Sequence, residues 1–559
     1  MTCRIRRNKP PPRPRLSVRT RRSSVVWLLA AILLGQLHAQ APAAELSESP
    51  AQRPVKAVAR PAAKSGKTSP KRIAPKAATP GKPKPSALGD KINAILAESD
   101  AATQSHIGIN IVDLKTGRQL YEHDSARLFA PASTTKLFST ALALSRLGPQ
   151  HRFVTRITSS SSPAADGTLS GDLVMEGGGD PSLSDRLYPY RPEDGKARAA
   201  IEELADQIVS RGVQRITGGI VGDDTLYPWH PYPPGWTIDD SVADYGAPVS
   251  ALSVYDNTVR LAIRPGAKPG DAAQISVSPA LEYYTIDNHV ETVSGPAVLR
   301  LSRSPGSRQL LLWGTVSTRN GGVSELVAVD DPALFAAQAL ADALARRGVA
   351  IAAPPSARHR LVTEDPEPFD GFVLARRESP PLADLLQVID KVSQNLHAEI
   401  MLREVGRVRR GAATRSAGLD ELRRFLAENG IKGTDYAFED GSGLSRLTMV
   451  TPESQTRLLA KMSASKYRDV WMKLLPIAGV DGTLRRRFKG DKIPVYAKTG
   501  SLSHVSALAG YVEHPNGLRA FSILVNQSNY PAADVRAMID KIVVAIVEDP
   551  AKPCCGATQ

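Results

Sequence analysis

The feature that most constrains this chain is a change in composition at Asp90, because it separates a segment that cannot pack from one that can. Residues 1–89 contain 19 Lys and Arg against two Glu, whereas the whole 559-residue chain has a net charge of +15. The remaining 470 residues therefore carry a net charge of about −2, and they are numerous enough for two or three domains. A nearly neutral body lacks the cationic surface that phosphate groups require, so we predict no nucleic-acid partner.

The first 41 residues have the order of a secretory signal peptide. Nine Lys and Arg in residues 1–22 precede a short apolar run at 25–34, and small residues follow at 39–41. About ten apolar residues are too few to cross a hydrocarbon core of about 30 Å as a helix. We predict a signal peptide at 1–41 and export of the chain, with an uncleaved N-terminal anchor as the alternative.

Residues 42–88 form a predicted disordered linker. They contain nine Pro, ten Lys and Arg and no aromatic residue, so they cannot bury enough apolar surface to fold. The simplest role for such a segment is a spacer. The alternative is weak electrostatic contact with an anionic cell wall or membrane.

The three cysteines give no structural framework. Cys3 lies in the leader, and Cys554 and Cys555 are adjacent in a polar tail at 548–559. These positions provide neither a disulfide scaffold nor the spacing of zinc ligands. We predict that the protein uses no metal and no cofactor.

The folded part of the chain begins and ends with similar elements. Residues 106–121 alternate as a β-hairpin, and strands return between 495 and 525 before a terminal helix. The region in between has mostly short strands punctuated by Gly and Pro. We predict an α+β protein in which an antiparallel sheet backed by helices, built from 90–155 and 375–547, is interrupted by a β-rich insertion at 156–374.

Three short motifs occur in an order that indicates a serine nucleophile. Ser133-Thr134-Thr135-Lys136 opens a predicted helix, Ser393-Gln394-Asn395 lies between helical segments, and Lys498-Thr499-Gly500 ends a predicted strand. This trio is characteristic of penicillin-binding proteins and class A β-lactamases. A second S-x-x-K at 463–466 and a second K-T-G at 115–117 fail on order and placement.

The spacing of the first motif explains its chemistry. Ser133 and Lys136 are nearly one helical turn apart, so the amine can reach the hydroxyl, and the helix N-terminus favours an alkoxide. A buried lysine beside a second cation can stay neutral and act as the base, and Lys498 would be that cation. We expect Ser393 to relay a proton to the leaving amine and Asn395 to hold Lys136 and the substrate amide.

The last motif is expected to bind the substrate. Lys498 and the Thr499 hydroxyl would bind a substrate carboxylate, and the predicted binding set continues through Gly500 and Ser501. The oxyanion would meet the backbone N–H groups of Ser133 and Ser501, an interaction that often contributes about 100-fold in rate.

At these residues the chain resembles the class C low-molecular-mass penicillin-binding proteins, the D-alanyl-D-alanine carboxypeptidases and endopeptidases of bacterial cell walls. The similarity runs from about residue 90 to 547, and it includes the blocks 129–137, 177–181, 245–252, 440–446 and 498–502. It implies a transpeptidase-like domain related to the β-lactamases. It also implies a two-domain insertion in the long gap between Ser133 and Ser393.

The resemblance implies an activity as well. It implies a penicillin-sensitive serine D-Ala-D-Ala carboxypeptidase and endopeptidase of the periplasm, soluble or loosely held at the membrane, that cleaves peptidoglycan stem peptides and crosslinks through an acyl-serine. β-Lactam antibiotics would acylate Ser133. Inserted residues would help to bind the free end of the diaminopimelate side chain, and Asp224 and Arg446 are the candidates. The alternative for this pair is a turn residue and a surface arginine.

Two other functions remain open. A β-lactamase on the same fold would need a deacylating Glu in an E-x-x-x-N segment after the second motif, and no Glu after residue 393 has that spacing. A non-catalytic peptidoglycan-binding protein would have no need for the complete set of Ser133, Lys136, Ser393, Asn395 and Lys498.

Overall fold

The computed structural model describes residues 87–186, 195–365, 371–488 and 493–550. The predicted signal peptide, nearly all of the predicted linker and most of the predicted polar tail lie outside these described residues. Within the described ranges, none of the helices combines the length and the apolar character that crossing a membrane requires.

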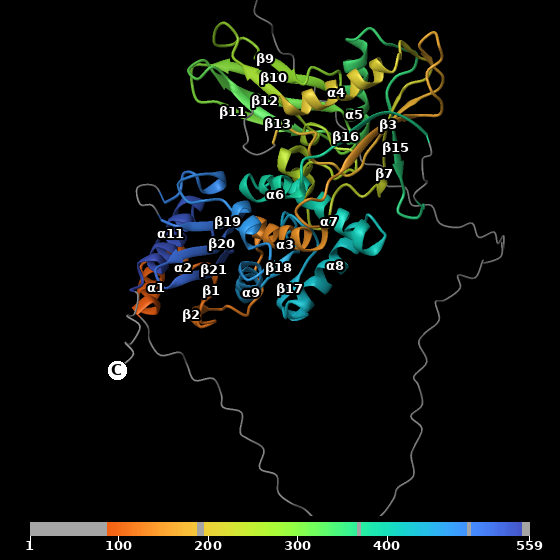
Figure 1. Ribbon diagram of the computed structural model, residues 1–559. Helices are drawn as coiled ribbons and strands as arrows, with labels where there is room; N and C mark the ends of the chain where they lie inside the picture. Colours follow the sequence, from red (N-terminus) through yellow and green to blue (C-terminus); the bar gives the residue numbers. More distant parts are fainter. Residues whose placement is uncertain (1–86, 187–194, 366–370, 489–492, 551–559) are drawn as a thin grey trace, which may run out of the picture. The chain divides into compact units, whose positions relative to one another are not determined.

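A five-stranded antiparallel sheet joins the two ends of the described chain (Figure 1). Its strands, in the order β19-β20-β21-β1-β2, are β19 Val495–Leu502, β20 Val505–His514, β21 Gly517–Asn526, β1 His106–Asp113 and β2 Gln119–His123. Strand β1 pairs with β21 along its whole length, with Ile109 opposite Ile523. A strand from the beginning of the domain therefore lies beside the strands that end it.

Alternation along the strands gives this sheet two buried faces. Phe521, Ile523 and Val525 of β21 pack on one side with α1 (Ala87–Ala97), α2 (Asp100–Thr103) and α11 (Ala532–Glu548). Ala520 and Leu524 point to the opposite side, into the core formed with the remaining helices of this part. Successive side chains of a strand point to opposite faces, so one strand serves both cores.

A layer of helices covers the second face. It consists of the 3-10 turn η1 (Ala132–Thr135), α3 (Lys136–Leu147), α6 (Leu382–Lys391), α7 (Asn395–Arg410), α8 (Arg415–Glu428), α9 (Pro452–Ser463), α10 (Arg468–Leu474) and the short turn η5 (Gly433–Asp435). The short turn η6 (Gly482–Leu484) instead contributes Leu484 to the core on the first face. A two-stranded ribbon, β17 (Tyr436–Ala437) with β18 (Met449–Val450), lies between α8 and α9 in sequence. Helix α7 is buried from Asn395 to Gly406, which places its N-terminal end in the interior.

Between α3 and α6 the chain forms a second five-stranded sheet of mixed direction. Its order is β15-β7-β5-β3-β16, with β15 Ser356–Arg360, β7 Ile220–Pro228, β5 Leu173–Glu176, β3 Val154–Ser159 and β16 Phe372–Glu378. Helices α4 (Lys196–Ser210) and α5 (Pro332–Ala345) share its core. Three short parallel strands, β14 (Ala350–Ile351), β6 (Arg215–Ile216) and β4 (Thr168–Leu169), form a small separate sheet.

Residues 258–328 add two three-stranded sheets that share one core. The first has the order β13-β8-β9, with β13 Val323–Ala328, β8 Thr258–Arg264 and β9 Gln274–Ser278. The second has the order β10-β12-β11, with β10 Thr285–Val293, β12 Gln309–Ser317 and β11 Val298–Ser302. Leu261 and Ile263 from the first sheet and Leu310 and Leu312 from the second are fully buried together. The short turns η2 (Ile238–Val242), η3 (Asp244–Gly246) and η4 (Tyr255–Asn257) precede β8.

The predicted α+β architecture, a helix-backed antiparallel sheet interrupted by a β-rich region, is confirmed. Helix α4 is a difference, because the sequence suggested mainly short strands in this region. Its buried residues Ala197, Ala200, Ile201, Leu204 and Ile208 follow helical spacing, so the periodic signal was present. The predicted domain boundaries fall within β3 and β16, which pair with each other, and the division into domains remains our proposal.

Candidate active site

Ser133 lies in the 3-10 turn η1, which leads directly into α3 at Lys136. The sequence predicted one helix from 133 to 147, and the tighter turn is the difference. Ala132 has a left-handed backbone with φ 48°, a conformation that residues other than glycine rarely adopt. Backbone strain of this kind is often found at active sites, and here it immediately precedes the predicted nucleophile.

The amine of Lys136 is completely buried and has three polar contacts. Its Nζ lies 2.9 Å from Ser133 Oγ, 2.5 Å from Asn395 Oδ1 and 2.7 Å from the carbonyl oxygen of Ser442. Burial holds the pKa of Lys136 well below its usual value, and the charge of Lys498 lowers it further against the pull of nearby carboxylates. This direction favours a neutral amine that can accept the proton of the serine.

The second motif lies where α6 ends and α7 begins. Ser393 has a left-handed backbone with φ 64°, so the chain turns sharply between the two helices. The side chain of Gln394 caps the first turn of α7. Asn395, the first residue of α7, holds Lys136 through Oδ1 and donates from Nδ2 to the carbonyl oxygen of Tyr245 at 2.7 Å. The amide is therefore fixed at both ends.

Lys498 reaches the site from β19. Its Nζ lies 2.9 Å from Ser393 Oγ and 2.9 Å from the carbonyl oxygen of Thr499. Burial lowers the pKa of Lys498 to about 8, and the carboxylate of Asp390 opposes this shift. Near neutral pH the group is therefore mainly charged, which suits a residue expected to bind a carboxylate.

Gly500 lets β19 lie against the turn that carries Ser133. A Cβ at this position would lie 2.6 Å from the carbonyl oxygen of Pro131, which is closer than a side chain can approach. Thr499 and Ser501 are two residues apart and so point to one face of the strand, where both are accessible. The predicted binding set therefore lies on the strand that borders the nucleophile.

The structure brings the five residues of the predicted catalytic set together as two lysine–serine pairs. These are Lys136 with Ser133 and Lys498 with Ser393, and Asn395 contacts the first lysine. Since each buried ammonium disfavours the other, the geometry supports one neutral amine and one cation. Among the described residues, no group of three or more His, Cys, Asp or Glu is placed to hold a metal ion.

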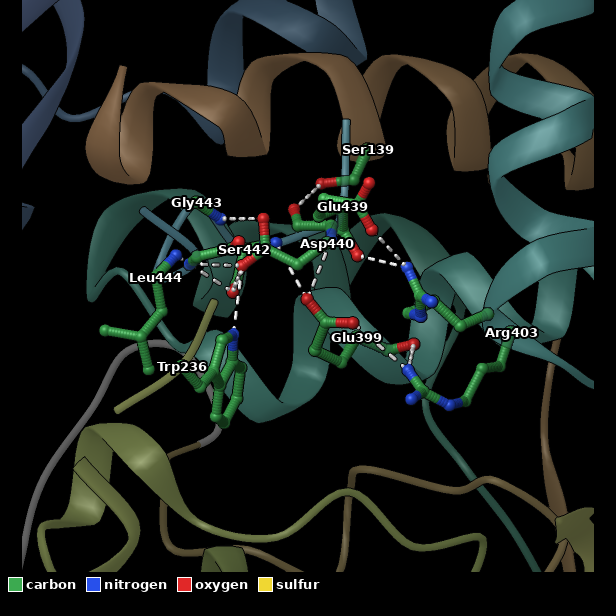
Figure 2. Close-up of polar contacts among 12 residues, drawn as sticks. Ser139, Trp236, Glu399, Arg403, Glu439, Asp440, Ser442, Gly443 and Leu444 are labelled. Atoms are coloured by element: carbon green, nitrogen blue, oxygen red, sulfur yellow. Dashed lines mark hydrogen bonds and ion pairs between the residues drawn. The ribbon is translucent and has the colours of Figure 1, made fainter. Parts of the chain in front are cut away.

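Glu399 of α7 fixes a loop that supplies one acceptor to the buried amine. We call residues 440–445 the DGSGLS loop. Glu399 is completely buried, and its Oε1 accepts hydrogen bonds from the N–H groups of Gly441 (2.7 Å) and Ser442 (3.0 Å) (Figure 2). Its Oε2 accepts a hydrogen bond from Arg403 Nη1 at 3.1 Å. The carbonyl of Ser442 is thus held in place by a carboxylate that the sequence analysis did not single out.

Asp440 organises the same loop from within. Its carboxylate accepts hydrogen bonds from Ser442 Oγ at 2.8 Å and from the N–H of Gly443 at 3.1 Å (Figure 2). Trp236, which comes from the inserted region, donates its indole N–H to Asp440 at 3.1 Å. In the sequence, this loop was recognised only as a block of family resemblance. Glu399 could not be predicted, because a single acidic residue inside a helix belongs to no recognisable motif.

A further buried carboxylate, Asp390, lies in α6 three residues before Ser393. It is completely buried, and neither of its carboxyl oxygens has a hydrogen-bond partner among the residues that the structure describes. The nearby Thr140 hydroxyl donates to the carbonyl oxygen of Lys136 at 2.6 Å. Burial raises the pKa of Asp390 to about 7, although the charges of Lys498 and Lys136 lower it. In its ionised form, this group favours the charged state of both lysines.

Asp224 and Arg446, which the sequence analysis paired, are not in contact. Asp224 is buried, with Oδ1 2.8 Å from His359 Nδ1 and Oδ2 accepting a hydrogen bond from Ser250 Oγ at 2.9 Å. Arg446 instead contacts Asp240, with 3.0 Å between Nη1 and Oδ2. The insertion contains many acidic residues, and only the tertiary structure shows which of them lies beside this arginine.

Comparisons with known proteins agree with this geometry. The family model for the D-Ala-D-Ala carboxypeptidase 3 (S13) family matches residues 88–546. A D-alanyl-D-alanine carboxypeptidase of Actinomadura sp. (strain R39) is 33% identical over 476 residues, which cover 82% of this chain and 84% of that protein. The crystal structure of penicillin binding protein 4 (dacB) from Haemophilus influenzae matches with a TM-score of 0.69 at 23% identity, over 81% of this chain and 98% of that one. The same protein complexed with a β-lactam matches with a TM-score of 0.66 at 22% identity, over 82% and 98%.

Proposed function

Because this chain belongs to the D-Ala-D-Ala carboxypeptidase 3 (S13) family, we propose that it uses Ser133 to hydrolyse the terminal D-Ala–D-Ala bond of peptidoglycan stem peptides. The chain is a penicillin-sensitive serine carboxypeptidase of the class C low-molecular-mass penicillin-binding proteins, and the resemblance inferred from its motifs is confirmed. The observation that carries the choice of nucleophile is the 2.9 Å contact between Ser133 Oγ and the buried amine of Lys136.

In the acylation step, Lys136 accepts the hydroxyl proton while Ser133 Oγ attacks the carbonyl carbon of the penultimate D-Ala. The N–H groups of Ser133 and Ser501 stabilise the oxyanion, and Lys498 with Thr499 binds the terminal carboxylate. The proton on Lys136 then passes by way of Ser393 to the amine of the departing D-Ala, and the C–N bond breaks.

In the deacylation step, water hydrolyses the acyl-serine. Lys136, neutral again, takes a proton from the attacking water and returns it to Ser133 Oγ as the ester breaks. Asn395 holds Lys136 in the same place throughout, because its own amide is anchored on the carbonyl of Tyr245.

Acylation by a β-lactam tests the nucleophile directly. After penicillin treatment, mass spectrometry should locate one adduct, on the peptide that contains Ser133. Ser133→Ala should abolish both the adduct and D-Ala release without changing the circular dichroism spectrum. Ser463→Ala, in the second S-x-x-K, is the matched control and should retain both.

Undiminished D-Ala release from the Ser133 variant would overturn the assignment. The lifetime of the adduct distinguishes the peptidase from a β-lactamase on the same fold. A long-lived penicilloyl adduct supports the peptidase, and rapid turnover of the drug would favour a β-lactamase.

We further propose that the enzyme also acts as an endopeptidase and that Arg446 binds the free end of a diaminopimelate side chain. That end carries an ammonium and a carboxylate, which suit the pair formed by Asp240 and Arg446. Asp240 lies in the segment that also provides the Tyr245 carbonyl to Asn395. Arg446→Ala should raise KM for stem peptides with this free end and leave penicillin acylation unchanged. Asp224→Asn is the control and should leave this KM unchanged, because Asp224 does not contact Arg446.

We propose that the chain acts outside the cytoplasm, where its substrate lies. Residues 1–41 would direct export, and residues 42–88 would serve as a spacer with weak attraction to anionic surfaces. Cell fractionation together with N-terminal sequencing of the mature protein tests this directly. An intact N-terminus in the cytoplasmic fraction would contradict it.

A further inference from the structure

The outer face of the β10-β12-β11 sheet is open to solvent. On β12, Leu310, Leu312 and Val316 point into the core, so the residues between them point outward. Leu311 and Trp313 on that side are 37% and 39% exposed, so the part of the chain that the structure describes leaves the face largely uncovered. The sheet lies far in sequence from the motifs of the active site.

Trp313 lies at the centre of this face. The register places His289 of β10 on one side of it and Arg300 of β11 on the other. Leu311 is the next outward residue on β12 in one direction, and Val298 of β11, 48% exposed, lies in the other direction, opposite Thr315. The indole therefore lies on an open sheet surface where a flat ligand can reach it.

Polar side chains surround the aromatic centre. Asp287 lies opposite Leu311 in the register, and Glu291 lies opposite Thr315. His289 Nε2 is 2.8 Å from Asp287 Oδ1, and both side chains are substantially exposed. With two carboxylates against one arginine and one histidine, the face offers both donors and acceptors. It has no dominant charge, so it does not suit a strongly charged polymer.

The size of the face limits what can bind there. Strands lie about 4.8 Å apart and alternate residues about 6.8 Å apart, so three strands with three outward residues each span about 10 by 14 Å. A stable protein interface buries about 800 Å² on each partner, far more than this area offers. The dimensions instead suit a short stretch of an oligosaccharide.

We propose that this face binds the glycan strand of peptidoglycan, a polymer of N-acetylated amino sugars. This proposal rests on the proposed function, because the stem-peptide substrate is attached to that glycan. The C–H face of a pyranose ring stacks on the indole of Trp313, while the hydroxyl and acetamido groups bond to the surrounding carboxylates, histidine and arginine. A neutral ligand rich in hydroxyl groups matches both the balanced charge and the small area of the face.

Binding of a chitin tetrasaccharide, a neutral oligomer of N-acetylglucosamine, to the full chain tests this proposal. Titration followed by tryptophan fluorescence and by calorimetry should show saturable binding, and Trp313→Ala should weaken it by about tenfold or more. Phe372→Ala removes a comparably exposed aromatic (41% exposed) from β16 and should leave binding unchanged. Leu311→Ser is a second variant on the same face, for use if the tryptophan variant does not fold.

Penicillin labelling of Ser133 shows that each variant is folded and keeps the two proposals separate. Normal labelling with lost glycan binding supports the glycan site. Absence of binding by the unmodified chain would overturn it. So would binding by the Trp313 and Leu311 variants that is as tight as binding by the unmodified chain. A dimer that Trp313→Ala dissociates would instead identify the face as a contact between copies and would also overturn it. Loss of D-Ala release bears only on the proposed function.

Discussion

Replacing Asp390 with Asn tests how the two buried lysines divide their charge. Asp390 is fully buried, its oxygens have no hydrogen-bond partner among the described residues, and it raises the pKa of both Lys498 and Lys136. Asparagine has the same shape but no charge. The substitution therefore changes the electrostatics of the site with little change in packing.

The size of the effect follows from Coulomb's law. A carboxylate about 5 Å from an ammonium contributes about 3 kcal/mol at an effective dielectric constant of about 20. This energy corresponds to a change of about 2 in the pKa of the ammonium. Without this charge, the pKa of Lys498 falls from its value of about 8, so the ammonium that binds the substrate carboxylate is lost at a lower pH.

The assay is the pH dependence of the second-order rate of acylation by a fluorescent penicillin. The rising limb reports loss of the proton from Lys136, and the falling limb reports loss of the proton from Lys498. In Asp390→Asn both limbs should move to lower pH. The falling limb should move further, because Lys136 retains other carboxylates nearby.

Asp384→Asn is the control for this experiment, because it removes an exposed carboxylate from the same helix, α6. It should leave the profile unchanged. A falling limb that stays in place in Asp390→Asn, or that moves to higher pH, would refute the assignment of Lys498 as the charged partner.

Two further predictions concern the DGSGLS loop. Gly443→Ala should slow penicillin acylation at least tenfold, because the φ of Gly443 is 78° and a Cβ there would overlap the carbonyl oxygen of Ala132. Gly430→Ala is the control, because Gly430 has a similar φ of 74° but open space around it. This variant incurs only the backbone strain of about 1–2 kcal/mol and should be acylated normally. Glu399→Gln should slow acylation by about tenfold or more and lower the melting temperature, because charge-assisted hydrogen bonds of about 1.5–3 kcal/mol each are lost. Glu421 of α8 is an equally buried acid, and Glu421→Gln should lower the melting temperature but leave the acylation rate unchanged. Equal acylation rates in the two variants would contradict this role for the loop.

Much of the site could be predicted because its first pair is local. Ser133 and Lys136 are three positions apart, and one turn of helix brings such residues together in any protein. The motif order then selected Ser133 and Lys498 over the competing matches at 463–466 and 115–117. Even so, the structure has a 3-10 turn with a strained Ala132 at the start of α3, which the helical pattern did not indicate.

Other parts of the site could not be predicted, because backbone atoms are the same in every residue. The carbonyl oxygens of Ser442 and Tyr245 hold Lys136 and Asn395, and nothing in their side chains indicates this. The same difficulty applies to Asp240, since many acidic residues occur in the insertion and pairing depends on which loop lies next to Arg446.

The sequence by itself determined the family and the α+β architecture, and it predicted the reactive serine and its base. These depend on periodicity and on short spacings, which local geometry converts into structure. The tertiary structure alone decided which carboxylates set the charge of the lysines and which carbonyl groups hold them. Those contacts join residues far apart in the chain, and their strength comes from burial, which exists only after the chain has packed.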